Sequence, residues 1–128
     1  MRWRNLIGGA VAGLTILAAS GPAHAHHSAA MFDRDKVVTL NATVKAWKWT
    51  NPHAWIQVVA PGANGATSEW NFECSTINIL ARKGWTIKSF KPGDKIEVTA
   101  HPMKDGTTAG LIMTVKTPDG RTLVDHDY

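Results

Sequence analysis

The longest run of alternating apolar and polar residues in this chain spans residues 37–49 and ends just before the dipeptide Asn51-Pro52. A period of two residues is typical of a β-strand with one buried and one exposed face. Proline fixes its own φ and disfavours helical geometry in the residue before it, so the strand has to end in a turn. The side of the strand that we expect to face the core carries Val38, Leu40, Ala42, Val44 and Ala46.

The rest of the chain predicts four more strands and one short helix. The strand patterns lie between turns rich in Gly, Pro, Asn and Asp, and they cover residues 54–60, 69–74, 95–100 and 109–116. The helix falls between the third and fourth strands, where Ser75 or Thr76 can cap its start and Gly84 can end it. This order predicts a mainly β fold, either a small five-stranded OB-like barrel or an open β-sandwich. OB barrels bind ligands beside the loop between the first two strands, which here contains His53.

The first 25 residues have the pattern of a secretory signal peptide. Arg2 and Arg4 precede an apolar segment over residues 6–19, and Ala23-His24-Ala25 is a small-residue cleavage site. The apolar segment is shorter than the roughly 20 residues that a transmembrane helix needs. We therefore expect cleavage after Ala25, export to the periplasm and no stable membrane anchor. Cleavage after Ala23 is the alternative, and it would leave His24 at the new N-terminus.

Beyond the signal we expect an extended N-terminal arm over residues 26–36, a single β-barrel-like domain over residues 37–124 and a polar tail over residues 125–128. Losing Arg2 and Arg4, each with a charge of +1, lowers the formal net charge from +4 to +2. So small a charge on an exported chain argues against nucleic-acid binding. Cys74 is the only cysteine, so the chain has no internal disulfide, and its position in an apolar strand predicts a buried side chain.

The histidines are the candidate metal ligands. A terminal His26 would offer its amine and its Nδ1 as a chelating pair, and a second imidazole would supply a third nitrogen. Nitrogen-rich tetragonal sites suit Cu(II). His53 is the first choice for the third nitrogen, followed by His27 and His101. The simpler interpretation is a solvated pair of terminal histidines and a turn histidine that is hydrogen-bonded to the backbone.

Glu73 is a polar residue within an apolar strand. We expect its carboxylate to face solvent or to pair with Arg82 or a lysine. The alternative is that Glu73 is an auxiliary ligand or orients one.

The turn that carries His53 is unusually rich in aromatic residues. Its side chains can pack in the core, or they can form a ligand-binding loop made of Trp47, Trp49, Asn51 and Trp55. No nucleophile, base and acid occur at a recognisable spacing, and no phosphate-binding glycine loop is present. We therefore expect no enzymatic activity.

The order of these motifs resembles a family of small exported bacterial proteins, the domain-of-unknown-function family 6152. The resemblance rests on the start His26-His27-Ser28 and on Trp49-Thr50-Asn51-Pro52-His53, and it covers essentially the whole mature chain. It implies a periplasmic β-barrel-like domain and no assigned activity. Two positions depart from the family pattern: Ala29, where an aromatic residue is frequent, and Thr76-Ile77, where Ser-Pro is frequent.

Two functional hypotheses follow. The first is a periplasmic protein that binds copper through His26 and His53, with His27, Glu73 or His101 as auxiliary groups, and that buffers the ion or delivers it to metal-handling or envelope proteins. The second is a metal-free binding module that holds a peptide, a glycan or an envelope protein through the aromatic loop.

Overall fold

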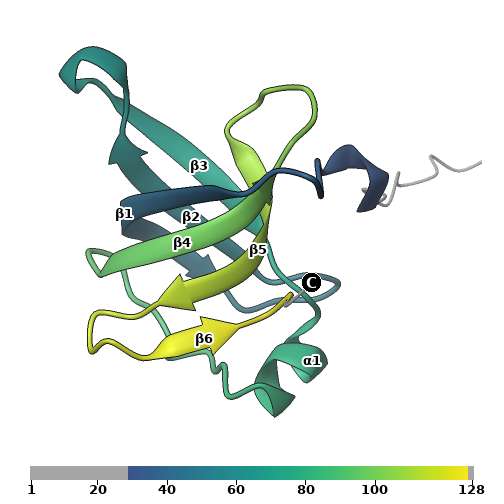
Figure 1. Cartoon of the computed structure of the whole chain (residues 1–128). Helices are drawn as coiled ribbons and strands as arrows, with labels where there is room; N and C mark the ends of the chain where they lie inside the picture. Colours follow the sequence, from purple (N-terminus) through teal and green to yellow (C-terminus); the bar gives the residue numbers. More distant parts are fainter. Residues whose placement is uncertain (1–28, 127–128) are drawn as a thin grey trace, which may run out of the picture.

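The computed structural model describes residues 29–126, which form a small β-barrel with one short α-helix beside it (Figure 1). The strands are β1 (Val38–Lys48), β2 (Trp55–Pro61), β3 (Thr67–Glu73), β4 (Lys95–Pro102), β5 (Ala109–Lys116) and β6 (Thr122–Val124). The helix is α1 (Ile77–Arg82), and two single 3-10 turns are η1 (Ala29–Met31) and η2 (Ala63–Gly65). In this part of the chain, no helix has the length and apolar character needed to cross a membrane.

The strands follow the order β3-β2-β1-β4-β5-β6, and β3 also pairs with β5. The β3–β5 pairing is parallel and joins Asn71 to Ala109, Phe72 to Gly110 and Glu73 to Leu111. It closes β1 to β5 into a barrel, so the predicted mainly β, OB-like fold with its helix between β3 and β4 is confirmed, and the open sandwich is excluded. Strand β6 was not predicted from the sequence. It pairs with the last residues of β5, whose first residues pair with β3.

The first strand departs from strict alternation at a β-bulge between Val44 and Ala46. Before the bulge Val44 pairs with Val58, and after it Trp47 pairs with Ile56, both partners being fully buried. An extra residue in one strand reverses which face the following side chains take. Trp47 therefore packs against the core in place of Ala46, and the prediction that Ala46 continues the buried face is wrong.

Aromatic rings fill the end of the barrel nearest α1. The ring centroid of Trp47 lies 5.6 Å from Trp49, 6.0 Å from Trp85 and 5.3 Å from Phe90. The indole N–H of Trp85 donates a hydrogen bond to the Val124 carbonyl at 2.9 Å, and that of Trp47 donates to the Thr86 carbonyl at 3.0 Å. This cluster joins β1 to β6 and to the segment after α1.

The described part of the predicted polar tail, residues 125 and 126, is not a tail. Asp125 is only 2% exposed, and its carboxylate accepts a hydrogen bond from the Ser75 N–H at 2.8 Å. The Asp125 N–H donates to the Met113 carbonyl at 2.8 Å, and the Lys83 ammonium donates to the Asp125 carbonyl. The tail prediction is wrong here because β6 carries the chain back to β5 and to the start of α1.

Trp85 and Trp70 each donate an indole hydrogen bond but differ in burial, which gives a test of the packing. Trp85→Phe removes a hydrogen bond and ring atoms from a site that is 1% exposed, so we expect the free energy of unfolding to fall by about 2–4 kcal/mol. Trp70→Phe is the matched control, because the half-buried Trp70 donates to the Ser68 hydroxyl at 3.0 Å, and its loss should cost about 1 kcal/mol or less. Urea unfolding measures both variants, and equal losses would contradict the packing described here.

Candidate functional site

The β1–β2 loop, the end of β3 and the start of α1 surround a cavity of about 200 Å³. We call it the histidine cavity. Its lining combines three residues of the N-terminal arm with the predicted turn histidine, the buried end of β3 and the last described residue: Ala29, Phe32, Arg34, His53, Glu73, Cys74, Ser75, Thr76, Ile79, Leu111 and His126. The structure therefore brings His53 and Glu73 to one site.

Backbone pairing fixes the loop that carries His53. The Asn51-Pro52 peptide bond is cis. Directly after it, the Ala54 N–H donates to the Ser75 carbonyl at 3.2 Å, and the Cys74 N–H donates to the Ala54 carbonyl at 2.9 Å. These bonds extend the β2–β3 pairing beyond the ends of both strands and hold His53 beside the end of β3.

The Nδ1 atom of the His53 ring already has a hydrogen-bond partner. Nδ1 lies 3.0 Å from the Cys74 carbonyl oxygen and 3.5 Å from Glu73 Oε1. In the tautomer that carries its proton on Nδ1, the ring donates to this carbonyl and keeps the lone pair of Nε2, as a metal ligand requires. The hydrogen bond to the backbone, which was the simpler interpretation of His53, is thus compatible with ligand binding.

Glu73 is buried, with only 7% of its side chain exposed, and it pairs with His53. The expectation that it faces solvent or pairs with Arg82 or a lysine is wrong. Its register partner is Trp55, so it lies on the outer face of the barrel, opposite the buried Phe72 and Ile56. Phe32 of the N-terminal arm lines both of the cavities that Glu73 borders.

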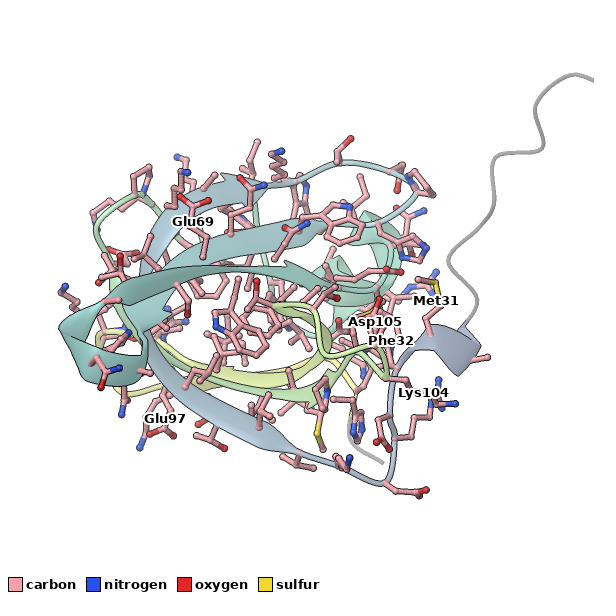
Figure 2. The ribbon with its side chains drawn as sticks, turned by 90° about the horizontal axis from the view of Figure 1, so that it is seen from above. Met31, Phe32, Glu69, Glu97, Lys104 and Asp105 are labelled. Atoms are coloured by element: carbon pink, nitrogen blue, oxygen red, sulfur yellow. The ribbon has the colours of Figure 1, made fainter. Side chains whose placement is uncertain are left out.

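The arm folds back along the loop between β4 and β5. Phe32 forms an isolated β-bridge with Met103, the Asp33 N–H donates to the Pro102 carbonyl at 2.8 Å, and the Lys104 N–H donates to the Met31 carbonyl at 3.0 Å. Figure 2 shows Met31 and Phe32 beside this loop. The arm was predicted as an extended segment, but no sequence pattern indicated where it would pack.

A second imidazole, that of His126, borders the same cavity. Its Nδ1 lies 2.8 Å from the Ile112 carbonyl oxygen and 3.4 Å from Asp125 Oδ2, and its Nε2 lies 3.4 Å from Ser75 Oγ. Sequence reasoning missed this residue because it was assigned to the tail. The apolar and β-branched triplet Thr122-Leu123-Val124 after the Pro118-Asp119-Gly120 turn is the signal that could have indicated a further strand.

Asp125 and His126 shift each other's pKa. Burial lowers the pKa of His126, but the hydrogen bond and charge of Asp125 outweigh it, so the pKa lies above its usual value of 6.5. Burial raises the pKa of Asp125, but hydrogen bonds from His126 and Ser75 outweigh it, so the pKa lies below 3.8. The pair is therefore charged and mutually stabilising at weakly acidic pH.

Cys74 lies at the back of the cavity and is fully buried, as predicted. Burial raises the pKa of its thiol well above the usual value, and the nearby charges of Asp125 and Glu73 add to the increase. A thiol in such surroundings remains protonated at neutral pH and is neither a nucleophile nor a thiolate ligand.

The other predicted ligands are not brought into the cavity. His101 is 2% exposed, its Nδ1 lies 2.8 Å from the Lys36 carbonyl oxygen, and it is absent from the cavity lining. His26 and His27 lie outside the described residues. Within residues 29–126, no three His, Cys, Asp or Glu side chains are grouped so as to hold a metal ion.

The residues of the predicted aromatic loop do not share one environment in the fold. Trp47 and Trp49 are half-buried and pack against the core, Asn51 is exposed, and Trp55 is half-exposed on β2. The first two rings thus contribute to the packing of the barrel end. Trp55 lies on the outer face beside Glu73.

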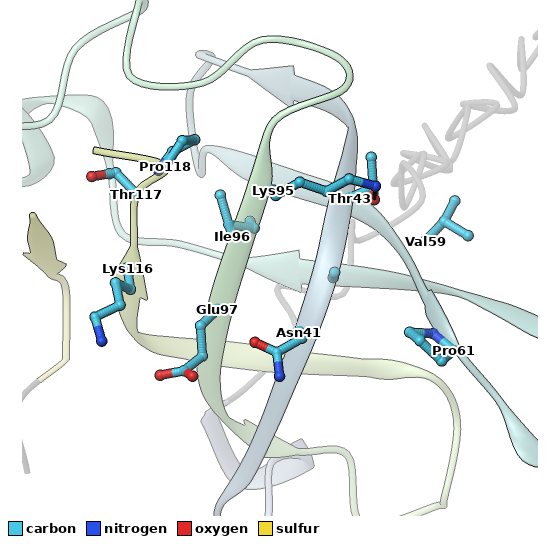
Figure 3. A pocket seen from close by; sticks show the side chains of 11 residues that line it. Asn41, Thr43, Val59, Pro61, Lys95, Ile96, Glu97, Lys116, Thr117 and Pro118 are labelled. Atoms are coloured by element: carbon cyan, nitrogen blue, oxygen red, sulfur yellow. Dashed lines mark hydrogen bonds between the residues drawn. The ribbon is translucent and has the colours of Figure 1, made fainter. Parts of the chain in front are cut away.

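A larger, open groove of about 500 Å³ crosses β1, β4 and the end of β5 (Figure 3). Its charged side chains are Lys95, Glu97 and Lys116, and the Lys95 ammonium donates to the Thr43 hydroxyl at 2.6 Å. It contains no histidine and none of the buried carboxylates. We therefore place the candidate site in the histidine cavity.

Residues 13–114 match a known protein family, described as a family of unknown function, DUF6152. The chain belongs to this family. The DUF6152 match includes His53 and Glu73 and ends before His126, and the resemblance drawn from the sequence motifs is confirmed at the level of the family. No curated protein and no solved structure matches the chain.

The Asp125 and His126 pair gives a pH-dependent prediction. A raised histidine pKa adds stability below pH 6.5 that is lost as the pH rises through the folded-state value, and a lowered Asp125 pKa adds stability above pH 3.8 that is lost on acidification. His126→Asn keeps a donor for the Ile112 carbonyl but cannot become charged. The wild type should therefore exceed this variant in free energy of unfolding by more at about pH 5.5 than at pH 8. Urea unfolding at both pH values measures the difference, and a gap that does not change with pH would contradict the charged pair.

Proposed function

We propose that this protein is an exported metal-binding protein that holds copper between its mature N-terminus and His53, and that it buffers the ion or delivers it. The observation that carries the proposal is the bond from His53 Nδ1 to the Cys74 carbonyl beside the buried Glu73. This arrangement fixes the tautomer and the orientation of the ring and reserves Nε2 for a ligand.

The length of the N-terminal arm is compatible with a shared site. Ala29 lines the histidine cavity, and three residues of chain lead from it to His26. Because an extended chain spans up to ~3.6 Å per residue, His26 can reach a point within roughly 11 Å of Ala29. That range is sufficient for a terminal amine to approach the cavity that His53 borders.

The donors in this proposal are nitrogen atoms. Cleavage after Ala25 would create an amine and an imidazole on one residue, and His53 would add a second imidazole. Such a set favours Cu(II), which also stands above the other divalent first-row metals in general affinity. Glu73 would orient His53, and His27 would be an auxiliary ligand. The His53 side chain is 38% exposed, which suits an ion that has to be exchanged with metal-handling or envelope proteins.

The metal-free alternative receives less support from the packing. Trp47 uses its indole N–H for the Thr86 carbonyl and its ring for Phe90, so it has little surface left for a peptide or a glycan. Asn51 and Trp55 are the members of the predicted aromatic loop that remain accessible to a partner.

Copper titration followed by EPR tests the proposal. Protein whose N-terminus is confirmed as His26 by intact mass should bind one Cu(II) with a nitrogen-rich tetragonal spectrum. A version with Gly-Pro placed before His26 should lose this spectrum, because the terminal amine and the His26 imidazole no longer chelate together and the proline has no amide N–H that could join a backbone chelate. Tight binding by both versions would contradict a terminal site.

Two carboxylate variants on β3 distinguish the orientation of His53 by Glu73 from a general effect of negative charge on copper binding. Glu73→Gln should weaken copper binding about 10–100-fold, since losing the group that orients a metal-bound histidine has an effect of this size. Glu69→Gln is the matched control, because Glu69 lies on the same outer face but is exposed and pairs with Lys45, and its affinity should equal that of the wild type. An unchanged affinity in His53→Ala would rule out the role of the turn.

A further inference from the structure

A second hollow, of about 160 Å³, shares Phe32 and Glu73 with the histidine cavity. We call it the aromatic hollow. It lies where the N-terminal arm and the β4–β5 loop cover the outer face of β3, and its lining is Phe32, Trp55, Asn71, Glu73, Met103, Ala109 and Gly110.

Main chain forms part of one wall of this hollow at Gly110, which pairs with Phe72 across the parallel β3–β5 contact. A Cβ at Gly110 would lie 2.7 Å from the His101 carbonyl oxygen and 3.2 Å from the ring of the fully buried Phe72, so close packing on the core side requires a glycine here. Phe32 and Met103, which bridge the arm to the β4–β5 loop, also line the hollow.

The polar groups in the walls of the hollow point to a cationic ligand. Glu73 is the only acidic or basic residue among them, and within residues 29–126 the one ionisable side chain paired with it is that of His53, whose Nδ1 lies 3.5 Å from Glu73 Oε1. Asn71 Oδ1 is buried and has no hydrogen-bond partner in the described part of the chain. A buried carboxylate and a buried amide oxygen are both stabilised by positive charge or by a hydrogen-bond donor.

The apolar groups in the walls of the hollow restrict the class of cation that it would bind. Trp55 and Phe32 supply aromatic rings, and Met103 supplies a polarisable thioether. Aromatic rings attract cations through the negative potential of their faces, and alkylated ammonium ions are the ligands that aromatic cages recognise. A bare ammonium would have to give up more hydration in such apolar surroundings than a methylated one.

We propose that the aromatic hollow binds the head group of a methylated ammonium ion, with choline as the representative ligand. Pockets for drug-sized molecules measure about 300–1,000 Å³, so this hollow is of the size for one head group. Glu73 would balance the charge, and Trp55 and Phe32 would contact the methyl groups. The lining of the hollow contains none of the proposed copper-ligating histidines, although Glu73 borders both sites, and the proposed binding needs no metal.

Choline titration of metal-free, ¹⁵N-labelled protein in the presence of EDTA tests this proposal by NMR. We expect saturable shifts of the Trp55 indole signal and of the Asn71 and Gly110 amide signals. The neutral isostere 3,3-dimethyl-1-butanol should bind at least about tenfold more weakly, because it keeps the shape but lacks the charge. Equal binding of both compounds, or shifts confined to other parts of the barrel, would overturn the proposal.

Charge and ring variants localise the binding. Glu73→Gln and Trp55→Leu should each weaken choline binding about tenfold. Glu97→Gln removes the same charge from the open groove (Figure 3) and should leave the affinity unchanged, because Glu97 lies well away from Phe32 (Figure 2). Dispersed amide spectra establish that each variant is folded. Choline binding by Glu73→Gln as tight as that of the wild type would overturn the site.

A further titration with phosphatidylcholine vesicles distinguishes a lipid head group from a free small molecule. Binding to phosphatidylcholine vesicles as well as to choline would assign the hollow to a lipid head group, and binding to choline alone would assign it to a free small molecule. Because copper is absent throughout, failure of choline binding leaves the copper proposal standing. A negative copper titration likewise leaves the aromatic hollow standing.

Discussion

Three residue pairs between β3 and β5 close this barrel, and both cavities depend on them. Asn71, Phe72 and Glu73 pair in parallel with Ala109, Gly110 and Leu111, although the two strands lie far apart in the sequence. Phe72 points into the core and is fully buried, while Glu73 lies on the outer face beside Trp55. Without this contact, the end of β3 would have no fixed position relative to the β4–β5 loop, and the arm would have no surface to cover.

Glu73 is a buried carboxylate that borders both cavities. Taking a carboxylate out of water costs several kcal/mol unless a partner compensates for it, and the only ionisable side chain paired with Glu73 in the described residues is the partly exposed His53. The fold retains this unfavourable burial between the histidine cavity and the aromatic hollow. Buried charged groups in a cavity are candidates for functional residues, because they are stabilised when a ligand supplies the opposite charge.

Local patterns predicted most of the elements but not their long-range contacts. Alternation and turn residues indicated β5 at its observed bounds. The helix between β3 and β4 was also predicted, and Thr76 is its N-cap residue, although the Thr76 side chain makes no cap hydrogen bond. The bulge in β1 was not predicted, because nothing in the sequence of the strand marks the position of its extra residue. The bulge turns Trp47 inward. Glu73 borders its cavities together with the N-terminal arm, and Asp125 is held by β5 and the start of α1. These segments are distant in sequence, so no local pattern could reveal the burial of either carboxylate.

In the proposed metal site, His53 and a terminal histidine hold the same copper ion. Electron spin echo modulation of the Cu(II)-loaded mature protein tests it directly, because the remote nitrogen of each bound imidazole modulates the echo. The account predicts two bound imidazoles in the wild type and one in His53→Ala. A single imidazole in the wild type, or the same number in both proteins, would contradict it.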